Sequence, residues 1–268
     1  MHFLRSIMIV MLLAAAATAQ ESSSSKGAQA AAPARAREAL TAKANAGDAG
    51  AAFVLGNMYE HGNGVPQSAA EAVKWYRKAA VLGNATAQFN LALILAKGRG
   101  VAADPVEAAK WYQKAAAQGD QQAAINLGIL YAQGKGVKQD GAEAARWFRL
   151  AAEAGNPMAE YNLGLLYSEQ LYSEGKTEAD DDRQAALWLG KAAEHGVVAA
   201  QNNLGVLYAD GRGVEKDLVQ AYKWFALAGE AGDSNAADAV QALTAEMKPE
   251  EIAQAKRLAQ EWVSKHSR

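Results

Sequence analysis

The sequence predicts an all-α fold, a right-handed α-solenoid of five helix–turn–helix repeats with N- and C-terminal capping helices. Two observations predict this fold. Hydrophobic residues make up 50% of the chain, alanine is abundant, and there are only five prolines, a composition that favours helix. A motif with a leucine and a tryptophan at fixed positions recurs along the chain, and both residues step together from copy to copy.

The recurring leucine and tryptophan set the register of the repeats. The leucines are Leu55, Leu91, Leu127, Leu163 and Leu204, and the tryptophans are Trp75, Trp111, Trp147, Trp188 and Trp224. The spacing is 36 residues, except for 41 residues between the fourth and fifth repeats. We therefore expect repeats at 51–86, 87–122, 123–158, 159–199 and 200–235.

Each repeat is expected to contain a helix A, a glycine-rich turn and a helix B. When the leucine is position 0, the alanine at −4 and the tyrosine or leucine at +4 fall on one face of helix A. Position +1 holds glycine in four repeats and alanine in one, which lets another helix approach closely. Asp104, Asp140 and Asp217 precede helix B and suit its N-terminus.

Residues 1–19 are expected to be a signal peptide. Residues 6–17 form an apolar run, SIMIVMLLAAAA, that is too short to span a bilayer comfortably. Ala17, Thr18 and Ala19 fit the small-x-small pattern, which predicts cleavage after Ala19, and the alternative is an uncleaved anchor. The mature chain is then expected to be periplasmic or secreted in a bacterium, without stable membrane insertion.

Atypical segments flank the repeats. Residues 20–33 are rich in serine and alanine and are expected to form a disordered linker. Residues 34–50 are expected to hold an N-terminal capping helix, because a terminal repeat has a neighbour on only one side. Residues 236–268 are expected to form C-terminal capping helices, the last of which begins at Pro249 and uses Trp262 to close the final hydrophobic face.

The recurring pattern LG..Y..G.GV...A..WY.KAA..G resembles that of Sel1-like repeats, a tetratricopeptide-like α-solenoid family, over residues 51–235. The resemblance implies stacked helix hairpins that bind proteins or peptides and usually lack catalysis. Similar secreted cysteine-rich repeat proteins carry a disulfide in each repeat, and binding or hydrolysis of β-lactams is associated with them. An enzyme that binds or hydrolyses β-lactams or peptidoglycan is therefore the alternative to a binding scaffold, although this chain has no cysteine.

The residue types of common active sites are missing or lack the spacing that their chemistry needs. The four histidines have no metal-ligand spacing, no GxSxG motif is present, and a cysteine nucleophile is impossible. The formal net charge of −2 suggests neither a nucleic-acid groove nor a polybasic membrane patch. We expect no catalytic residue, no metal and no cofactor, and a protein or peptide as the partner.

Two sets of helix-A residues are not needed for the expected core, and the first is a column of asparagines. Position −1 holds this residue in four repeats, as Asn90, Asn126, Asn162 and Asn203. Asparagine is a mediocre helix former, so its recurrence needs a cause. One interpretation is a ladder of amides that hydrogen-bonds an extended peptide backbone. The alternative is hydrogen bonding between repeats or to the backbone of helix caps.

The second set is apolar and occupies positions −2 and +2 of repeats two to four. Its members are Phe89, Leu93, Ile125, Ile129, Tyr161 and Leu165. They lie nearly opposite the stripe at −4, 0 and +4, and a helix that is apolar on two faces is either buried on both or presents a binding surface. With the four asparagines they form the candidate partner-binding groove on the concave helix-A surface. The alternative is packing between neighbouring helices A.

Repeat four departs from the pattern. Its sequence LYSEQLYSEG accounts for the five extra residues, and the acidic run EADDD at residues 178–182 precedes helix B. We expect a protruding loop in which Glu174 and residues 178–182 are solvated. Contact with a basic partner or a cation is the alternative, although the run lacks the alternating spacing of a calcium loop.

Overall fold

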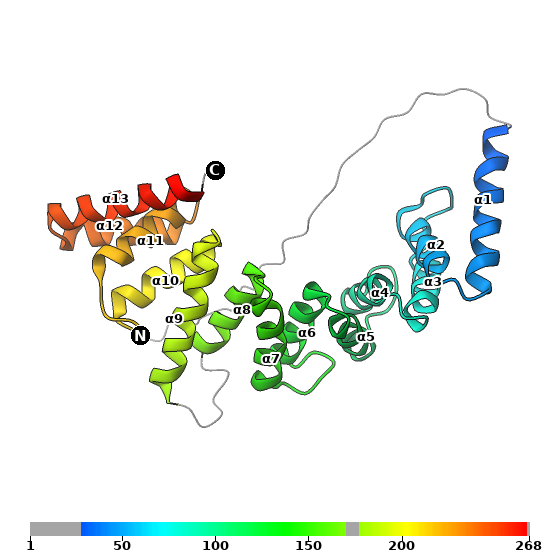
Figure 1. Cartoon of the computed structure of the whole chain (residues 1–268), viewed down its shortest axis with the longest axis horizontal. Coiled ribbons are helices and arrows are strands. Elements are labelled where there is room, and N and C mark those ends of the chain that lie inside the picture. The colour runs from blue at the N-terminus through cyan, green and yellow to red at the C-terminus, as the bar shows by residue number, and fades with distance from the viewer. Residues whose placement is uncertain (1–27, 170–176, 267–268) are drawn as a thin grey trace.

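The computed structural model describes residues 28–169 and 177–266, and these residues form thirteen α-helices and no strand (Figure 1). The helices are α1 Ala28–Asn45, α2 Ala49–His61, α3 Ala69–Val81, α4 Ala85–Lys97, α5 Pro105–Ala117, α6 Gln121–Gln133, α7 Gly141–Glu153, α8 Pro157–Ser168, α9 Glu178–Glu194, α10 Val198–Asp210, α11 Leu218–Glu230, α12 Ser234–Glu246 and α13 Pro249–His266. The predicted all-α fold is confirmed.

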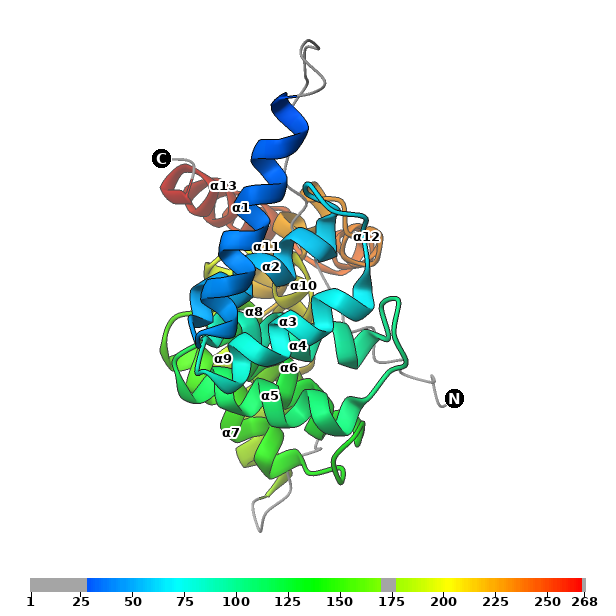
Figure 2. The same ribbon diagram turned by 90° about the vertical axis from the view of Figure 1, so that its right-hand side faces the viewer.

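The helices form a curved array of hairpins. The helices A are α2, α4, α6, α8 and α10, and the helices B are α3, α5, α7, α9 and α11. Each helix A packs against the helix B that follows it, and each helix B from α3 to α9 packs against the next helix A. Figure 1 shows α4, α6 and α8 on the inner side of the curve and α5 and α7 on its outer side, and Figure 2 looks along the array from the α1 end. The helices A therefore make the inner surface.

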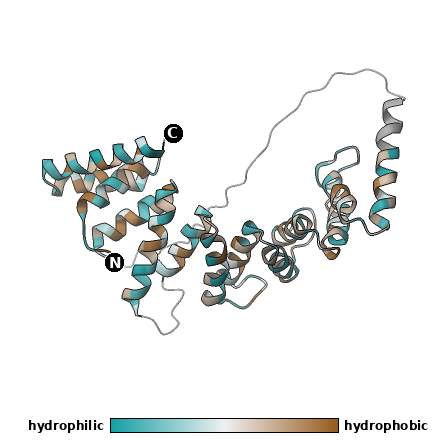
Figure 3. Ribbon diagram, in the orientation of Figure 1, coloured by the Kyte–Doolittle hydropathy of each residue, from teal (hydrophilic) through white to brown (hydrophobic). Residues whose placement is uncertain are grey.

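A hydrophobic core runs through the array, and a second, smaller cluster of buried residues joins α11, α12 and α13. The five reference leucines are at most 3% exposed, and the five reference tryptophans are at most 8% exposed. Core residues extend from Ala44 in α1 to Ala259 in α13. Figure 3 shows hydrophobic residues throughout the helices A, whereas hydrophilic residues predominate along α13. The C-terminal end of the array is thus closed by a more polar helix, as a solenoid end requires.

The glycine at position +1 makes room for helix B of the same repeat. A Cβ atom on Gly128 would lie 2.6 Å from the ring of Phe148. A Cβ atom on Gly56 would lie 2.5 Å from the ring of Tyr76. The predicted close approach is confirmed, and its partner is the residue that follows the reference tryptophan.

The turn between helix A and helix B rests on the preceding repeat. A Cβ atom on Gly136 would overlap the backbone carbonyl of Pro105 at the start of α5. A Cβ atom on Gly213 would overlap the backbone carbonyl of Asp182 in the first turns of α9. Beside Gly213, Arg212 donates to the Asp182 carboxylate at 2.6 Å. The second glycine of the turn is therefore a contact point between repeats.

The predicted helix ends are confirmed where the structure describes them. The carboxylates of Asp104, Asp140 and Asp217 accept backbone N–H groups of the first turn of helix B at 2.8, 3.0 and 2.9 Å. Helix α6 ends at Gly134, whose φ of +65° belongs to the left-handed region that glycine adopts without strain. The corresponding residue of repeat four, Gly175, lies outside the described residues.

The acidic run of repeat four is helical, which corrects the expectation of a solvated loop. Helix α9 takes in the whole run, and Thr177 caps it through a capping box with Asp180. Asp181 and Asp182 are only 2% and 8% exposed. The dipole at the start of a helix stabilises carboxylates there, and Arg212 of the next repeat forms an ion pair with Asp182.

Some expectations fall on residues that the structure does not describe. These are the signal peptide at 1–19, most of the linker, and the protruding loop with Glu174. Helix α1 begins at Ala28 and so includes residues 28–33 of the segment expected to be a disordered linker. The alanine-rich sequence of these residues favours helix.

The C-terminal helices do not form a sixth hairpin. Helix α12 continues the 36-residue register of the helices A, but Gln241 stands at position +1, where the repeats have glycine or alanine. Because that position faces helix B in the repeats, α13 packs mainly against α11 instead. Trp262 covers the end of the core, since its ring lies 6.4 Å from that of Trp224 and its Nε1 donates to Glu194 at 3.0 Å.

Candidate partner-binding surface on the helices A

The position of a residue along helix A decides which neighbour it contacts. Position −2 faces helix B of the same repeat, because the ring of Phe89 lies 5.9 Å from that of Tyr112 in α5. Phe53 and Tyr76 make the equivalent contact at 5.8 Å. The alanines at −4 and the leucines at 0 are at most 5% exposed and belong to the core. The side that remains holds positions −1 and +2.

The structure separates the ten predicted groove residues into two groups. Ile125, Ile129, Tyr161 and Asn162 are 3%, 6%, 7% and 8% exposed. All four lie on α6 and α8 and are buried, so they offer little open surface to a ligand. The half-buried group consists of Phe89, Asn90, Leu93, Asn126, Leu165 and Asn203.

The side chains of three of the four asparagines lie beside tyrosine hydroxyl groups of the neighbouring repeat and act to lower the pKa of those hydroxyls. The pairs are Asn90 with Tyr76, Asn126 with Tyr112, and Asn203 with Tyr161. The Tyr76 hydroxyl donates to Glu60 at 2.6 Å. Burial, and then this carboxylate, raise the pKa of Tyr76 above its usual value, so the hydroxyl keeps its proton. Polar contact between repeats is thus available to these three asparagines.

Sequence reasoning missed a second polar column, at position −3. Gln88, Glu160 and Gln201 stand there and are 4%, 3% and 2% exposed. Gln88 and Gln201 each donate to a backbone carbonyl at the end of the preceding helix B, at 3.0 and 3.2 Å. The Glu160 carboxylate lies 2.8 Å from Nδ1 of His195. The available signal was the recurrence of a long polar side chain at one register position next to the core.

The inner surface is almost uncharged over its centre. Helices α4, α6 and α8 carry only two charged residues, Lys97 and Glu160, and Glu160 is buried. Burial, together with the charge of Arg99, lowers the pKa of Lys97. The half-buried residues at −1 and +2 are asparagines and leucines. This surface can therefore offer amide hydrogen bonds and aliphatic contacts to a ligand.

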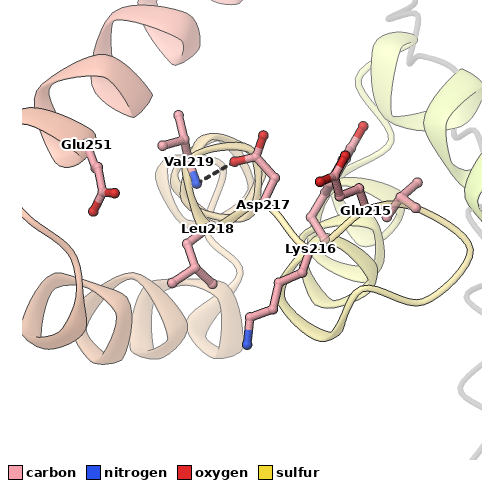
Figure 4. A pocket seen from close by; sticks show the side chains of 8 residues that line it. Glu215, Lys216, Asp217, Leu218, Val219 and Glu251 are labelled. Atoms are coloured by element: carbon pink, nitrogen blue, oxygen red, sulfur yellow. Dashed lines mark hydrogen bonds between the residues drawn. The ribbon is translucent and has the colours of Figure 1, made fainter.

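A separate recess lies at the turn between α10 and α11, beside the first turn of α13 (Figure 4). It measures about 670 Å³ and is lined by Tyr208, Val214, Glu215, Lys216, Asp217, Leu218, Val219 and Glu251. The Asp217 carboxylate already accepts the Val219 N–H at 2.9 Å as the cap of α11. Turn and cap residues form most of this recess, and none of the predicted groove residues lines it.

The described part of the chain offers neither a metal centre nor a membrane span. Within residues 28–169 and 177–266, histidine and acidic side chains form no cluster of three or more that could hold a metal ion. In the same residues no helix is both long enough and apolar enough to cross a bilayer.

The repeat register corresponds to that of a known family. The family model described as Sel1 repeat matches at residues 49–84, 85–120, 121–156, 157–197 and 198–233. The chain belongs to the Sel1 repeat family. Each matched repeat of this Sel1-repeat protein begins at the first residue of a helix A, two residues before the expected bound. The expected bounds start at the alanine of position −4, which lies within the first turn of that helix.

Two solved structures resemble this Sel1-repeat protein over most of its length. One is c5321, a protective antigen present in uropathogenic Escherichia coli strains that displays an SLR fold. It is 35% identical in sequence with a TM-score of 0.70, and the match covers 86% of this chain and 48% of the E. coli chain. The other is a Sel1 repeat protein of Oxalobacter formigenes, which is 30% identical in sequence with a TM-score of 0.66. That match covers 88% of this chain and 99% of the O. formigenes chain. The chain thus spans about half the length of the E. coli protein. No curated protein matches it.

Proposed function

We propose that this Sel1-repeat protein is a non-enzymatic scaffold of the cell envelope that holds a protein or peptide segment on the concave surface of its helices A. The observation that carries the proposal is the partial exposure of four residues at positions −1 and +2 of the helices on the inner side of the curve (Figure 1), namely Asn90, Leu93, Asn126 and Leu165. Stacked helix hairpins create extended concave surfaces, and proteins of this family are typically interaction scaffolds.

The chemistry of the inner surface defines the segment that it would hold. Leu93 on α4 and Leu165 on α8 are half-buried aliphatic side chains that suit apolar side chains of a partner. An asparagine side chain has two N–H donors and an acceptor oxygen, so Asn90 and Asn126 can bond a peptide backbone as well as a tyrosine. The scarcity of charge from α4 to α8 favours an uncharged segment.

The envelope location rests on the N-terminal sequence and on one relative. The apolar run at residues 6–17 and the small residues up to Ala19 support export, with cleavage after Ala19. The E. coli protein of 35% identity is a protective antigen, which is in keeping with a location outside the cytoplasm. The partner would then be another protein of the envelope.

Aspartate at the two half-buried leucines tests the inner surface. We expect Leu93→Asp with Leu165→Asp to lower the amount of each captured envelope protein by at least about tenfold, because a carboxylate pressed against an apolar partner loses its hydration unpaired. Capture is measured by mass spectrometry, with mature wild type and variant as baits in the same envelope extract.

A matched control places two aspartates at the end of α3. Val81 and Leu82 are 70% and 44% exposed and belong neither to positions −1 and +2 of a helix A nor to the cationic stripe of the helices B, so Val81→Asp with Leu82→Asp adds the same charge elsewhere. Helical circular dichroism equal to that of wild type shows that both variants are folded. Undiminished capture by the inner-surface variant, or an equal loss in the control, would contradict the proposal.

The alternative function, an enzyme acting on β-lactams or peptidoglycan, rests on the family resemblance. We expect the purified mature chain to hydrolyse a chromogenic β-lactam no faster than buffer alone, because the amides and leucines of the inner surface supply neither a nucleophile nor a general base. Absorbance of the opened β-lactam measures the rate. Hydrolysis that copurifies with the chain through successive purification steps would show that the protein is an enzyme and would contradict the proposed non-enzymatic function.

A further inference from the structure

One stripe on the outward side of helices α3, α5, α7 and α9 carries cations and exposed aliphatic side chains, and acidic residues stand beside this stripe but not in it. Counted from the reference tryptophan, positions −5, −1 and +3 lie about one turn apart and form one stripe on each helix. On α3 and α5 the cations of this stripe are Lys74, Lys78, Lys110 and Lys114, and on α7 and α9 they are Arg146, Arg183 and Lys191. The other members are Ala70, Val106, Ala142, Leu150 and Leu187. These twelve residues are named the outer face.

Tryptophans of the core hold several of these cations at the surface. The Lys114 ammonium lies 4.4 Å from the centre of the Trp111 ring, and the Lys191 ammonium lies 3.9 Å from that of Trp188. The negative face of an aromatic ring attracts a cation. Such a cation is already positioned on the outer face, so it loses less conformational entropy when it binds an anion.

Neighbouring carboxylates leave much of this charge unbalanced. Three of the seven cations are paired with a carboxylate of their own helix, namely Lys74 with Glu71, Arg146 with Glu143 and Arg183 with Asp180. Among the described residues, no carboxylate lies within ion-pair distance of Lys110, Lys114 or Lys191. The cations of the outer face are not evident from the formal net charge of −2, because residues 154–268 hold 18 acidic and only 11 basic residues and so offset the positive charge of residues 1–153.

Aliphatic side chains stand exposed among the cations. Val106, Leu150 and Leu187 are 51%, 50% and 49% exposed. Leu187 occupies position −1, which holds a lysine or arginine on α3, α5 and α7, and Leu150 occupies position +3, which holds a lysine on α3, α5 and α9. Single exposed apolar residues are ordinary on protein surfaces, but these three belong to the same outer face as seven cations.

We propose that the outer face is a docking surface for an anionic lipid bilayer, to which the folded chain adsorbs without crossing it. The cations complement the lipid phosphates, and the aliphatic side chains enter the boundary between headgroups and acyl chains. A soluble polyanion complements the cations equally but leaves the valine and leucines in water. The exposed aliphatic residues therefore favour a lipid surface. This docking uses the side opposite the helices A and does not depend on the proposed partner segment.

Cosedimentation of the full chain with vesicles of phosphatidylglycerol and phosphatidylcholine in equal parts, at low salt, measures adsorption. We expect Lys110→Gln with Lys114→Gln to lower the partition coefficient about thirtyfold, since each surface cation contributes about fivefold. The matched control, Lys135→Gln with Lys138→Gln, removes the same charge from an exposed turn and is expected to change adsorption less than about twofold.

A second variant separates lipid from other anions. Leu150→Ser with Leu187→Ser keeps every charge and is expected to weaken adsorption at least about tenfold. The apolar residues 6–17 are common to wild type and variants, and vesicles of phosphatidylcholine alone report their contribution. If loss of the Lys114–Trp111 contact disturbs the fold, Lys110→Gln alone is expected to lose about fivefold.

Three results would overturn the lipid proposal. The first is equal adsorption of wild type to anionic and neutral vesicles. The second is equal weakening by the outer-face and turn lysine variants, which would reduce the effect to net charge. The third is wild-type adsorption of the serine variant together with full competition by dextran sulfate, which would assign the outer face to soluble polyanions.

Discussion

Gly213→Ala is expected to destabilise the array by about 3 kcal/mol or more, from two costs that add. The φ of Gly213 is +69°, in the left-handed region, where a Cβ atom costs about 1–2 kcal/mol. The new Cβ would also overlap the carbonyl group of Asp182 in the first turns of α9. Because this obstacle is backbone, the turn of repeat five has to move away from α9, which weakens the ion pair between Arg212 and Asp182.

Gly155→Ala is the matched control for this prediction. Its φ of +79° carries the same left-handed strain, but no heavy atom lies within 4 Å of the new Cβ. We expect a loss of about 1 kcal/mol. Urea unfolding followed by far-ultraviolet circular dichroism measures both variants. Equal losses for Gly213→Ala and Gly155→Ala would show that the contact between the turn and α9 contributes nothing to stability.

Gly128→Ala is expected to lower the free energy of unfolding by about 2 kcal/mol, even though alanine is the better helix former. The added methyl group would lie 2.6 Å from the ring of Phe148. That ring is 3% exposed and is surrounded by core residues, so it has little room to shift. The overpacking therefore exceeds the gain in helix propensity.

Gly190→Ala in α9 is expected to have the opposite sign. This glycine also lies within a helix, but no heavy atom is within 4 Å of its new Cβ. The change should raise the free energy of unfolding by about 0.5–1 kcal/mol through helix propensity alone. Thermal unfolding of the two variants, side by side, checks the signs. A gain for Gly128→Ala would contradict close packing of helix A on helix B.

The elements and their order could be predicted from the sequence because the signals are local or repeated. Leu127 and Trp147 mark one helix each, Asp140 caps the second, and Gly134 ends the first. The family match and the helix bounds agree with the predicted repeats to within two residues. Repetition supplied the remaining evidence, since a pattern seen in five copies is stronger than any one of them.

The candidate site was predicted less well, because helical periodicity shows which residues share a face but not which neighbour that face meets. Phe89 was expected on the floor of the groove, yet it packs on Tyr112 of its own hairpin. Asn126 was left between two interpretations, and its position beside the Tyr112 hydroxyl favours contact between repeats. The half-buried Leu93 and Leu165 remain as the aliphatic part of the proposed inner surface.

Short-range patterns in this chain were enough to specify helices, turns, caps and the register that stacks them. Contacts between residues about one repeat apart decided the rest. The run EADDD is compatible with a solvated loop as well as a helix, and Arg212, 30 residues beyond Asp182, contributes to its burial in α9. Such pairings depend on how neighbouring hairpins pack, and packing, unlike a helical period, is a property of the assembled array.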